Sequence, residues 1–320
     1  MIRTFKAAAL ALATLSLAGC LAREEPPLRV ATNMWPGYES LYLARSLGYF
    51  GRAPIRLVEL TSATEVARAM RNGTVEAAAL TLDEALGLMQ DGVDLKAILV
   101  MDVSNGSDAL LAKPGIDSLS ALKGKRVGVE NGATGAVMLD AALHAAALES
   151  RDINVIPIPV NEHLAAWRAG KVDALVTFEP VRTELLPSGA QVLFDSSQIP
   201  GRIIDVLVVR SEVADAHRQQ LSQLLASHFA ALGYLSSHPH EASQQMTLRL
   251  KVLPQQVLSQ LAGMTLPGCD ENHRYLAGDH PELMSAGHAL AVLMLDRQLL
   301  KRSVDVAHLA DSSFLPECHR

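Results

Sequence analysis

The chain has 320 residues, of which 49% are hydrophobic and 19% are charged. A length of this order suggests two domains, and the apolar content is enough to bury a sizeable core. The formal net charge is −6, which argues against a nucleic-acid partner because such a partner requires a basic face. The composition therefore indicates a globular protein of two domains that does not act on nucleic acid.

Residues 1–20 carry the pattern of an export signal. Arg3 and Lys6 precede an apolar run, Ala7 to Ser16, that is shorter than the roughly 20 residues of a membrane-spanning helix. This layout is typical of a secretory signal peptide. The segment closes on the tetrapeptide LAGC at Cys20, which resembles the lipobox of bacterial lipoproteins, where the thiol accepts diacylglycerol. The alternative is an ordinary signal peptide with a chance cysteine.

We therefore expect lipid on Cys20, a short tether over residues 21–27, and anchoring to a membrane on the extracytoplasmic side of the cell envelope. Two further cysteines remain, Cys269 and Cys318. An exported protein meets an oxidising compartment, where these two can form a disulfide that pins the C-terminal tail. Two free or buried thiols are the alternative.

A first series of strand and helix patterns follows the tether. The predicted strands are Leu28–Thr32, Ile55–Leu60, Glu76–Leu80 and Leu95–Met101, and the helices between them are Ser40–Leu47, Thr64–Arg71 and Asp83–Gln90. Strands that alternate with helices predict parallel pairing with right-handed crossovers.

A second, similar series begins near Asp108. Its predicted strands are Ala109–Ala112, Arg126–Val129, Asn154–Pro157, Ala174–Thr177, Val192–Phe194 and Asp205–Val209, with helices at Leu119–Leu122, Gly135–Leu148, Glu162–Ala169 and Pro180–Leu186. The remainder, Ser211 to Asp311, reads as almost wholly helical, with breaks at four prolines. Two α/β units of this kind place a ligand cleft at the carboxyl ends of their strands.

Short segments in order along the chain resemble the nitrate/sulfonate/taurine-type solute-binding proteins of ABC transporters. The similarity is collinear from about Leu28 to Arg210. The segments that carry it are 33–39 (NMWPGYE), 48–50 (GYF), 71–73 (RNG), 102–108 (DVSNGSD), 122–130 (LKGKRVGVE), 169–174 (AGKVDA) and 178–180 (FEP).

The resemblance implies a type II periplasmic-binding-protein fold, in which two α/β lobes meet at a hinge and a helical C-terminal tail packs on the first lobe. Lobe one would comprise residues 28–104 and 210–320, and lobe two residues 105–209, with crossings near 103–108 and 205–210. The implied function is capture of a small organic solute by a monomer that delivers it to an ABC permease.

Two other functions stay open beside this one. The chain could be a sensing subunit that reports the solute to a membrane receptor or signalling enzyme. It could also be an enzyme on this fold, although the known pathways of such enzymes are cytosolic and this chain carries an export signal.

By the same resemblance, the loops that follow the strands hold the ligand. In lobe one, Trp35 and Tyr38 offer flat apolar faces for a small organic body, unless one of them is simply core. The other candidates are Asn33 in that loop, Thr81 and Asp83 at a helix start, and Ser104 and Asn105 at the crossing. Helix capping or a turn would explain these last four equally well.

In lobe two, the segment with Asn131, Thr134 and Gly135 passes from strand to helix. Such a helix start suits a carboxylate or sulfonate, or is an ordinary cap, and it lacks the Lys-Ser/Thr ending of a nucleotide P-loop. The remaining candidates are Thr177, Glu179 and Asp205. Glu179 could accept from an amine or cap the next helix. The acids near the cleft, with no obvious Lys or Arg, favour a ligand with an amine or aromatic part over a simple anion.

Motifs of catalysis and metal binding are lacking in the sequence. There is no His-Glu-x-x-His, no Cys-x-x-Cys and no Gly-x-Ser-x-Gly. We therefore expect no metal, no cofactor and no catalytic residue.

Overall fold

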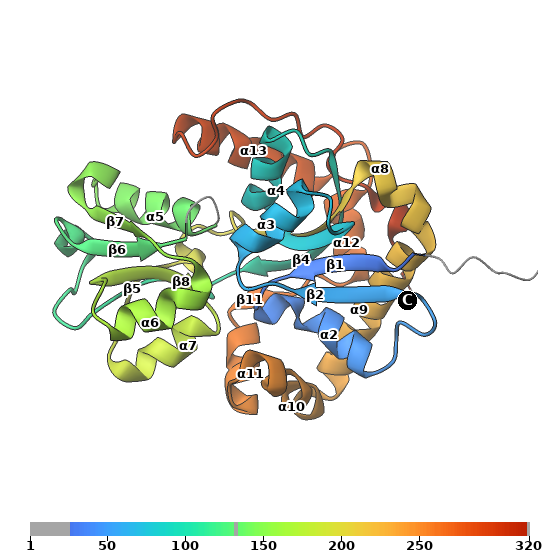
Figure 1. Ribbon diagram of the computed structural model, residues 1–320, viewed down its shortest axis with the longest axis horizontal. Helices are drawn as coiled ribbons and strands as arrows, with labels where there is room; N and C mark the ends of the chain where they lie inside the picture. Colours follow the sequence, from blue (N-terminus) through green and yellow to red (C-terminus); the bar gives the residue numbers. More distant parts are fainter. Residues whose placement is uncertain (1–25, 131–133, 319–320) are drawn as a thin grey trace, which may run out of the picture.

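The computed structural model describes residues 26–130 and 134–318 of the chain (Figure 1). The predictions for the signal segment, for Cys20 and for Asn131 therefore lie outside the described residues. Two separate β-sheets organise the rest, and the second lies to the left of the first in Figure 1. Within the described part of the chain, no helix combines the length and apolarity that crossing a bilayer requires.

The first sheet has six strands in the order β11-β4-β10-β3-β1-β2. Their bounds are β1 Leu28–Thr32, β2 Ile55–Glu59, β3 Ala77–Thr81, β4 Leu95–Ser104, β10 Ile204–Arg210 and β11 Met264–Thr265. The second sheet has five strands in the order β7-β6-β8-β5-β9. They are β5 Asp108–Ala112, β6 Arg126–Val129, β7 Asn154–Pro157, β8 Ala174–Phe178 and β9 Gln191–Asp195.

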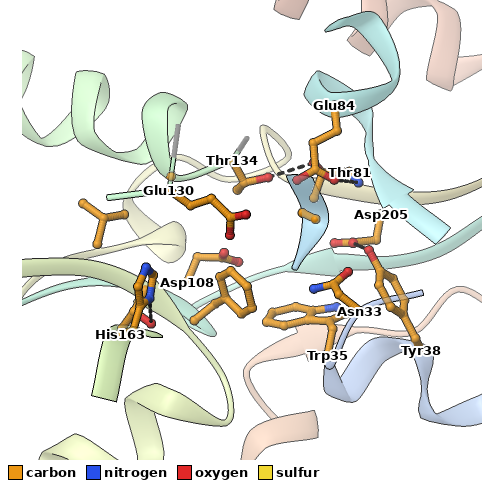
Figure 2. Close-up of a pocket in the computed structure, with 15 residues that line it drawn as sticks. Asn33, Trp35, Tyr38, Thr81, Glu84, Asp108, Glu130, Thr134, His163 and Asp205 are labelled. Carbon is orange, nitrogen blue, oxygen red and sulfur yellow. Dashed lines mark hydrogen bonds between the residues drawn. The ribbon is translucent and has the colours of Figure 1, made fainter. Parts of the chain in front are cut away.

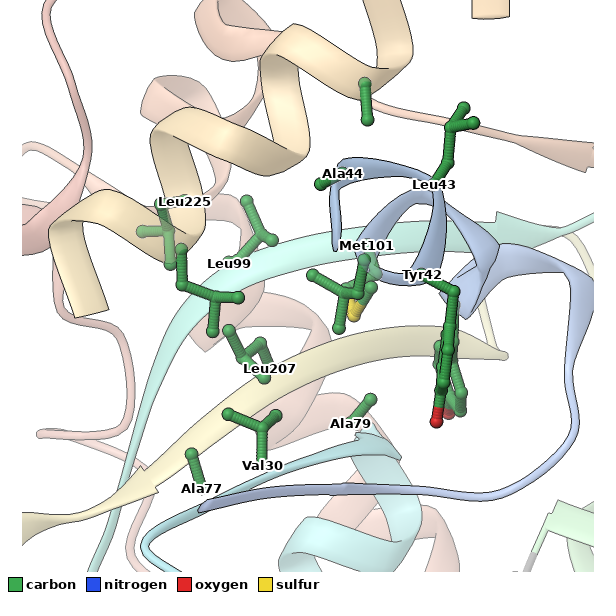
Figure 3. Close-up of a cluster of buried hydrophobic side chains, with 14 of the residues drawn as sticks. Val30, Tyr42, Leu43, Ala44, Ala77, Ala79, Leu99, Met101, Leu207 and Leu225 are labelled. Carbon is green, nitrogen blue, oxygen red and sulfur yellow. The ribbon is translucent and has the colours of Figure 1, made fainter. Parts of the chain in front are cut away.

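Helices cover both faces of the first sheet, and alternation along β10 shows why. Leu207 and Val209 pack on one face with α2 (Glu39–Ser46) and α9 (Arg218–Ser237) (Figure 3). Val206 and Val208 pack on the other face with α3 (Ala63–Arg71), α4 (Leu82–Gln90) and α13 (Glu282–Asp296). Successive side chains of a strand point to opposite faces, so a strand covered on both sides must be apolar throughout.

The second sheet repeats this plan with shorter helices. Leu110 and Ala112 of β5 pack toward α5 (Thr134–Ala145), whereas Ala109 and Leu111 pack toward α6 (His163–Arg168) and α7 (Val181–Leu185). The fold is therefore the predicted α/β architecture of two lobes, each built on its own sheet (Figure 1).

The second crossing between the lobes differs from the prediction. The chain leaves the first sheet between β4 and β5, near residues 103–108 as expected, but returns between β9 and β10, over residues 196–203. Residues 205–210 are instead a strand in the middle of the first sheet. The predicted end of lobe two at residue 209 is therefore wrong, because an apolar strand buried on both faces fits a central position rather than a connection.

Strand pairing is also only partly as predicted. β1 pairs in parallel with β2 and β3, and β6 with β7 and β8. However, β10 lies between β3 and β4 and pairs antiparallel with both. The expectation of parallel pairing is therefore wrong for β4, which pairs antiparallel with the strand that returns from lobe two.

The C-terminal tail packs on the first lobe and is mainly helical as far as Asp296, with the short strand β11 between two of its helices. Its helices are α8 Ser211–Ala214, α9, α10 Pro239–Leu250, α11 Pro254–Leu261, α12 Cys269–Leu276 and α13. The predicted helix up to Asp311 is wrong beyond this point. Leu300, Val306 and Leu309 are buried there without helical structure, because this segment lies along β4 and bridges Ala97 to Ala310. A disulfide joins Cys269 to Cys318 and ties this end to α12.

Candidate ligand-binding site

A cavity lies between the two sheets, where the carboxyl ends of β1, β3, β6 and β8 meet the first residues of β5 and β10 (Figure 2). Its free volume is about 30 Å³, so the cavity is narrow. The lining residues are Asn33, Trp35, Tyr38, Ala63, Thr81, Glu84, Asp108, Glu130, Thr134, Gly135, His163, Val176, Thr177, Phe178 and Asp205.

Most of the residues proposed from the sequence line this cavity. These are Asn33, Trp35, Tyr38, Thr81, Thr134, Gly135, Thr177 and Asp205.

Four others lie outside the cavity, each because it serves the fold locally. The carboxylate of Glu179 accepts from Arg182 Nη1 (3.0 Å) and from the amide of Thr183 (2.9 Å), so it caps the next helix. Asp83 accepts from Thr134 Oγ1 at 3.1 Å, behind the cavity wall. Ser104 bonds the hydroxyl of Ser196, and Asn105 is an exposed crossing residue whose amide donates to the carbonyl of Gly263.

The aromatic wall is built by the loop after β1. The indole N–H of Trp35 donates to Asp102 Oδ2 at 2.9 Å, and its ring meets Phe178 edge-on with centroids 5.6 Å apart. Gly37 makes this packing possible, since a Cβ there would lie 1.8 Å from Asp102 Oδ2. The hydroxyl of Tyr38 donates to Asp205 Oδ1. Both aromatic side chains are thus fixed by buried carboxyl groups.

Two hydrogen-bonded contacts join the lobes beside the cavity. Thr134 Oγ1, at the start of α5, donates to Thr81 Oγ1 of the first lobe at 2.8 Å. Glu130 Oε1, after β6, accepts from the hydroxyl of Thr64 at 2.6 Å and from its amide at 3.3 Å. The structure therefore shows the lobes in contact around the cavity, held by polar groups of both.

Carboxyl groups dominate the chemistry of the cavity. Glu84, Asp108, Glu130 and Asp205 line it, and Asp102 lies behind Trp35. Burial raises the pKa of Asp108 and that of Asp102 to about 7. Burial, followed by the charges of neighbouring carboxylates, raises the pKa of Asp205 and of Glu84 well above the usual range. The fold thus holds several acids where their ionised forms are poorly solvated.

Some of these carboxyl oxygens have no partner. Among the described residues, Asp102 Oδ1, Asp108 Oδ2 and Asp205 Oδ2 are buried and accept no hydrogen bond. No Lys or Arg is found among the described residues that line the cavity. Buried acceptors left without donors are unusual in native proteins and call for an explanation at the site.

The one histidine of the described lining is neutral. His163 Nε2 lies 3.1 Å from the carbonyl of Ile158, which can only accept, so this nitrogen carries the proton. Nδ1 then accepts from the hydroxyl of Thr177 at 3.0 Å. Burial lowers the pKa of His163 to about 4, so the ring adds no positive charge at neutral pH.

Sequence reasoning did not propose several residues that line the cavity, among them Glu84, Asp108, Glu130 and His163. Asp108 and Glu130 lie at the ends of quoted family segments, next to the crossing and before the helix-start loop, and that position was the available signal. Glu84 and His163 occur in helices, where an ordinary capping or core role explains them as well.

The two α/β lobes, the two crossings and the cavity between the sheets define the fold of the periplasmic binding proteins. Residues 21–250 match the model of the NMT1-like family. The chain belongs to this family.

Similar proteins include binding proteins of bacteria. The "Putative aliphatic sulfonates-binding protein" of Bacillus subtilis is 24% identical over 231 residues, which cover 72% of this chain and 64% of that protein. A "Putative binding protein" of Brucella abortus is 26% identical over 150 residues, which cover 46% of this chain. The chain spans about half the length of this Brucella relative, 47%.

Solved structures of similar fold include the alkanesulfonate-binding protein SsuA of Xanthomonas axonopodis pv. citri bound to MOPS. Its TM-score is 0.76 at 21% identity, with 88% of this chain and 97% of that chain covered. The nitrate-binding protein NrtA of Synechocystis PCC 6803 has a TM-score of 0.70 at 12% identity, with 89% and 84% covered. At these identities the likeness concerns the fold.

Proposed function

We propose that this protein is an extracytoplasmic solute-binding lipoprotein that captures a small organic solute between its lobes and delivers it to an ABC importer. One observation carries the proposal: the cavity is lined by residues of both lobes, and beside it Thr134 of one lobe bonds Thr81 of the other at 2.8 Å. A solute that contacts both walls stabilises the closed arrangement by its differential affinity for that state. Roughly 5.5 kcal/mol moves a two-state ratio from 1:99 to 99:1.

The same geometry supports binding without chemistry. In the cavity, the hydroxyl of Thr177 contacts the imidazole of His163, with Oγ1 at 3.0 Å from Nδ1. The lowered pKa of His163, about 4, makes the ring a weak base for activating that hydroxyl. The other nitrogen of His163 meets the carbonyl of Ile158 rather than a carboxylate that would stabilise the charged ring.

Release of bound molecules tests the capture of a solute. The full-length protein, purified from its native host, is denatured and the small molecules set free are identified by mass spectrometry. We expect a compound that also binds the refolded protein in a calorimetric titration, at a stoichiometry of about one. The proposal would be contradicted if no compound is released and if fractionated host metabolites do not change the melting temperature.

Membrane anchoring is tested separately at Cys20. The lipid tether belongs to the proposal because the lipobox-like segment ends at this residue. In cells fed with a labelled fatty acid, we expect label on the wild type and none on Cys20→Ser, with the variant shifted from the membrane fraction to the wash. Equal labelling of both chains would overturn the lipoprotein assignment and leave solute capture unaffected.

The importer as partner is tested in the same host. Cross-linking in intact cells, followed by mass spectrometry of the captured peptides, is expected to yield an ABC permease. Recovery of a receptor or signalling enzyme in its place would favour the sensing function over import.

A further inference from the structure

We propose that the cavity takes an organic cation with a primary ammonium head group, held by Asp108 and Asp205, with its apolar body against Trp35 and Phe178. This inference rests on the proposed capture of a solute and names the chemical class of that solute. It sets this site apart from one built for a sulfonate or nitrate, the ligands named for the SsuA and NrtA structures.

Three hydrogen-bond donors of the cavity wall, those of Trp35, Tyr38 and His163, are already engaged. The indole N–H of Trp35 donates to Asp102, and the hydroxyl of Tyr38 donates to Asp205 Oδ1. The ring N–H of His163 donates to the carbonyl of Ile158. Each of these groups carries a single proton for hydrogen bonding in its neutral form. An anion such as a sulfonate needs hydrogen-bond donors, and these three donors already have acceptors within the protein.

The acceptors, in contrast, are left open. Oδ2 of Asp108 and Oδ2 of Asp205 have no hydrogen-bond partner among the described residues, and the two side chains are only 5% and 2% exposed. The hydroxyl of Thr177 donates to His163 and keeps its own lone pairs. A primary ammonium has three N–H donors, which matches this set of acceptors. In Figure 2 the carboxyl groups of Asp108 and Glu130 point into the same part of the cavity.

Charge favours the same occupant. Glu84, Asp108, Glu130 and Asp205 line the cavity, and its described lining holds no Lys or Arg. A buried charge without a counter-ion costs several kcal/mol, so ionised carboxylates here require a cation from outside the fold. A negatively charged solute would add like charge to a poorly solvated acidic site.

A metal ion fits this geometry less well than an organic cation. Within the described chain, one set of three or more potential ligand atoms lies within 4.8 Å of one another, that of Cys269, His273 and Cys318. These two cysteines are bonded to each other and cannot act as thiolates. The cavity carboxylates are not in such a set, so their spacing suits a larger, hydrogen-bonding cation rather than one small ion.

The aromatic part of the wall sets the shape of the body that follows the ammonium. Trp35 and Phe178 meet edge-on at 83°, and both line the cavity. A ring or short apolar chain packs well on such a pair.

Four probes with the same ring and different head groups test the proposal by calorimetry near pH 8. Benzylamine offers charge and N–H donors, benzyltrimethylammonium charge without donors, benzyl alcohol one donor without charge, and benzenesulfonate the opposite charge. We expect benzylamine to bind at least tenfold more tightly than the alcohol or the quaternary amine, and the sulfonate not to bind. Tenfold corresponds to 1.4 kcal/mol.

Asp108→Asn and Asp205→Asn are each expected to weaken benzylamine binding at least tenfold, because one charged contact to the ammonium is lost. Asp279→Asn is the matched control, an exposed aspartate outside the cavity lining, and should bind as the wild type does. A circular dichroism melt of each variant verifies that it is folded.

The remaining outcomes overturn the inference in distinguishable ways. Tight binding of benzenesulfonate or nitrate would overturn the cationic class and leave solute capture standing. Binding of calcium or magnesium that Asp108→Asn abolishes would replace the organic cation by a metal. Equal binding of amine and alcohol would remove the role of the carboxylates. If benzylamine does not bind, while an uncharged or anionic compound is released from the native protein, the inference fails and the proposed function holds.

Discussion

Two groups of buried carboxyls lie in or beside the first lobe, and they differ in what neutralises them. Glu39 begins α2, directly after the loop of residues 33–38 that carries Trp35 and Tyr38 (the ligand loop). It is 1% exposed and pairs with Arg249 of α10. Asp108 and Asp205, in the cavity wall, are buried to a similar degree and face no Lys or Arg among the described lining residues. The fold supplies a cation to Glu39, and it supplies none to the two acids of the cavity.

The guanidinium of Arg249, which neutralises Glu39, is itself held by several further contacts. It pairs with Glu39, bonds Glu59 Oε2 at 2.8 Å and stacks over the ring of Tyr42 at 3.8 Å from the centroid. It also donates to the carbonyl of Asn33 at 2.8 Å, which fixes the start of the ligand loop. Even so, burial raises the pKa of Glu39 to about 7. The cavity acids lack such a partner, and this contrast points to the ligand as the missing cation.

The largest expected effect comes from removing the structural cation. Arg249→Met should lower the free energy of unfolding by about 3–5 kcal/mol, because it leaves Glu39 buried without its partner. Urea denaturation measures this loss. The double variant Glu39→Gln/Arg249→Met removes the orphaned charge and should regain a substantial part of the loss. If the single variant is as stable as the wild type, the pair does not hold the ligand loop.

Removing a cavity acid should have the opposite effect and raise the free energy of unfolding of the empty protein. Asp108→Asn takes away a buried group whose Oδ2 has no partner, so the empty protein should become more stable at pH 8, by about 1–3 kcal/mol. The same urea experiment measures it. A loss of stability would mean that Asp108 is a structural residue, as Glu39 is.

The pH dependence follows from the same acids. A carboxyl whose pKa is raised in the folded state binds its proton more tightly there, so its contribution favours the folded state at low pH and is lost as pH rises through the folded pKa. For Asp108 and Asp102 that value is about 7. The melting temperature of the empty protein should therefore fall as pH rises from about 5 to about 8. Asp173, whose pKa Arg126 lowers to about 2, adds nothing to this window.

The charged neighbours of the cavity acids all raise the pKa values of these acids, whereas the hydrogen bonds of Ser104 and Tyr38 lower them. Asp108 faces Ser104, Asp102, Asp83 and Glu179, and Asp205 faces Tyr38, Asp102, Asp108 and Glu84. Since no cation is among them, benzylamine affinity should rise with pH through about 7 and binding should release protons. Calorimetry in two buffers of different ionisation enthalpy measures the released protons. An affinity that falls with pH over this range would contradict the charge assignment.

The smallest effect is expected at the contact between the lobes. Thr134→Val keeps the shape but removes the hydroxyl that donates to Thr81 Oγ1 at 2.8 Å. One such hydrogen bond contributes about 0.5–1.5 kcal/mol, so ligand affinity should fall roughly threefold to tenfold with little change in unfolding. Thr74→Val, at an exposed position of the first lobe, is the matched control. Unchanged affinity would mean that the hydrogen bond between Thr134 and Thr81 does not contribute to closure of the lobes around the ligand.

Much of the fold could be predicted from the sequence, because the strands are short apolar runs bounded by clear helix signals. The expected strand Leu28–Thr32 matches β1 residue for residue, and the alternation of strands and helices gave two α/β units. Pairing was harder to predict, since β10 reads as the last strand of lobe two while its place between β3 and β4 depends on contacts distant in sequence. The segment after Asp296 has apolar spacing that suits a helix but covers the edge of a sheet.

The cavity was predictable at or just after the end of a strand, as at Thr177 and Trp35. It was not predictable where a side chain has two roles that look alike in sequence. Glu179 and Glu84 both begin a helix, yet only Glu84 reaches the cavity, because Glu179 turns to Arg182 at 3.0 Å. Which acid reaches the cavity is a property of the packed structure and not of the sequence pattern.

A crystal structure of the protein with the amine that binds most tightly tests the central claim most directly. We expect the amine nitrogen within about 3 Å of carboxyl oxygens of both Asp108 and Asp205, with side chains of both lobes around the ligand. An amine that contacts one lobe alone, or that lies outside the cavity lined by Trp35 and Phe178, would contradict this account.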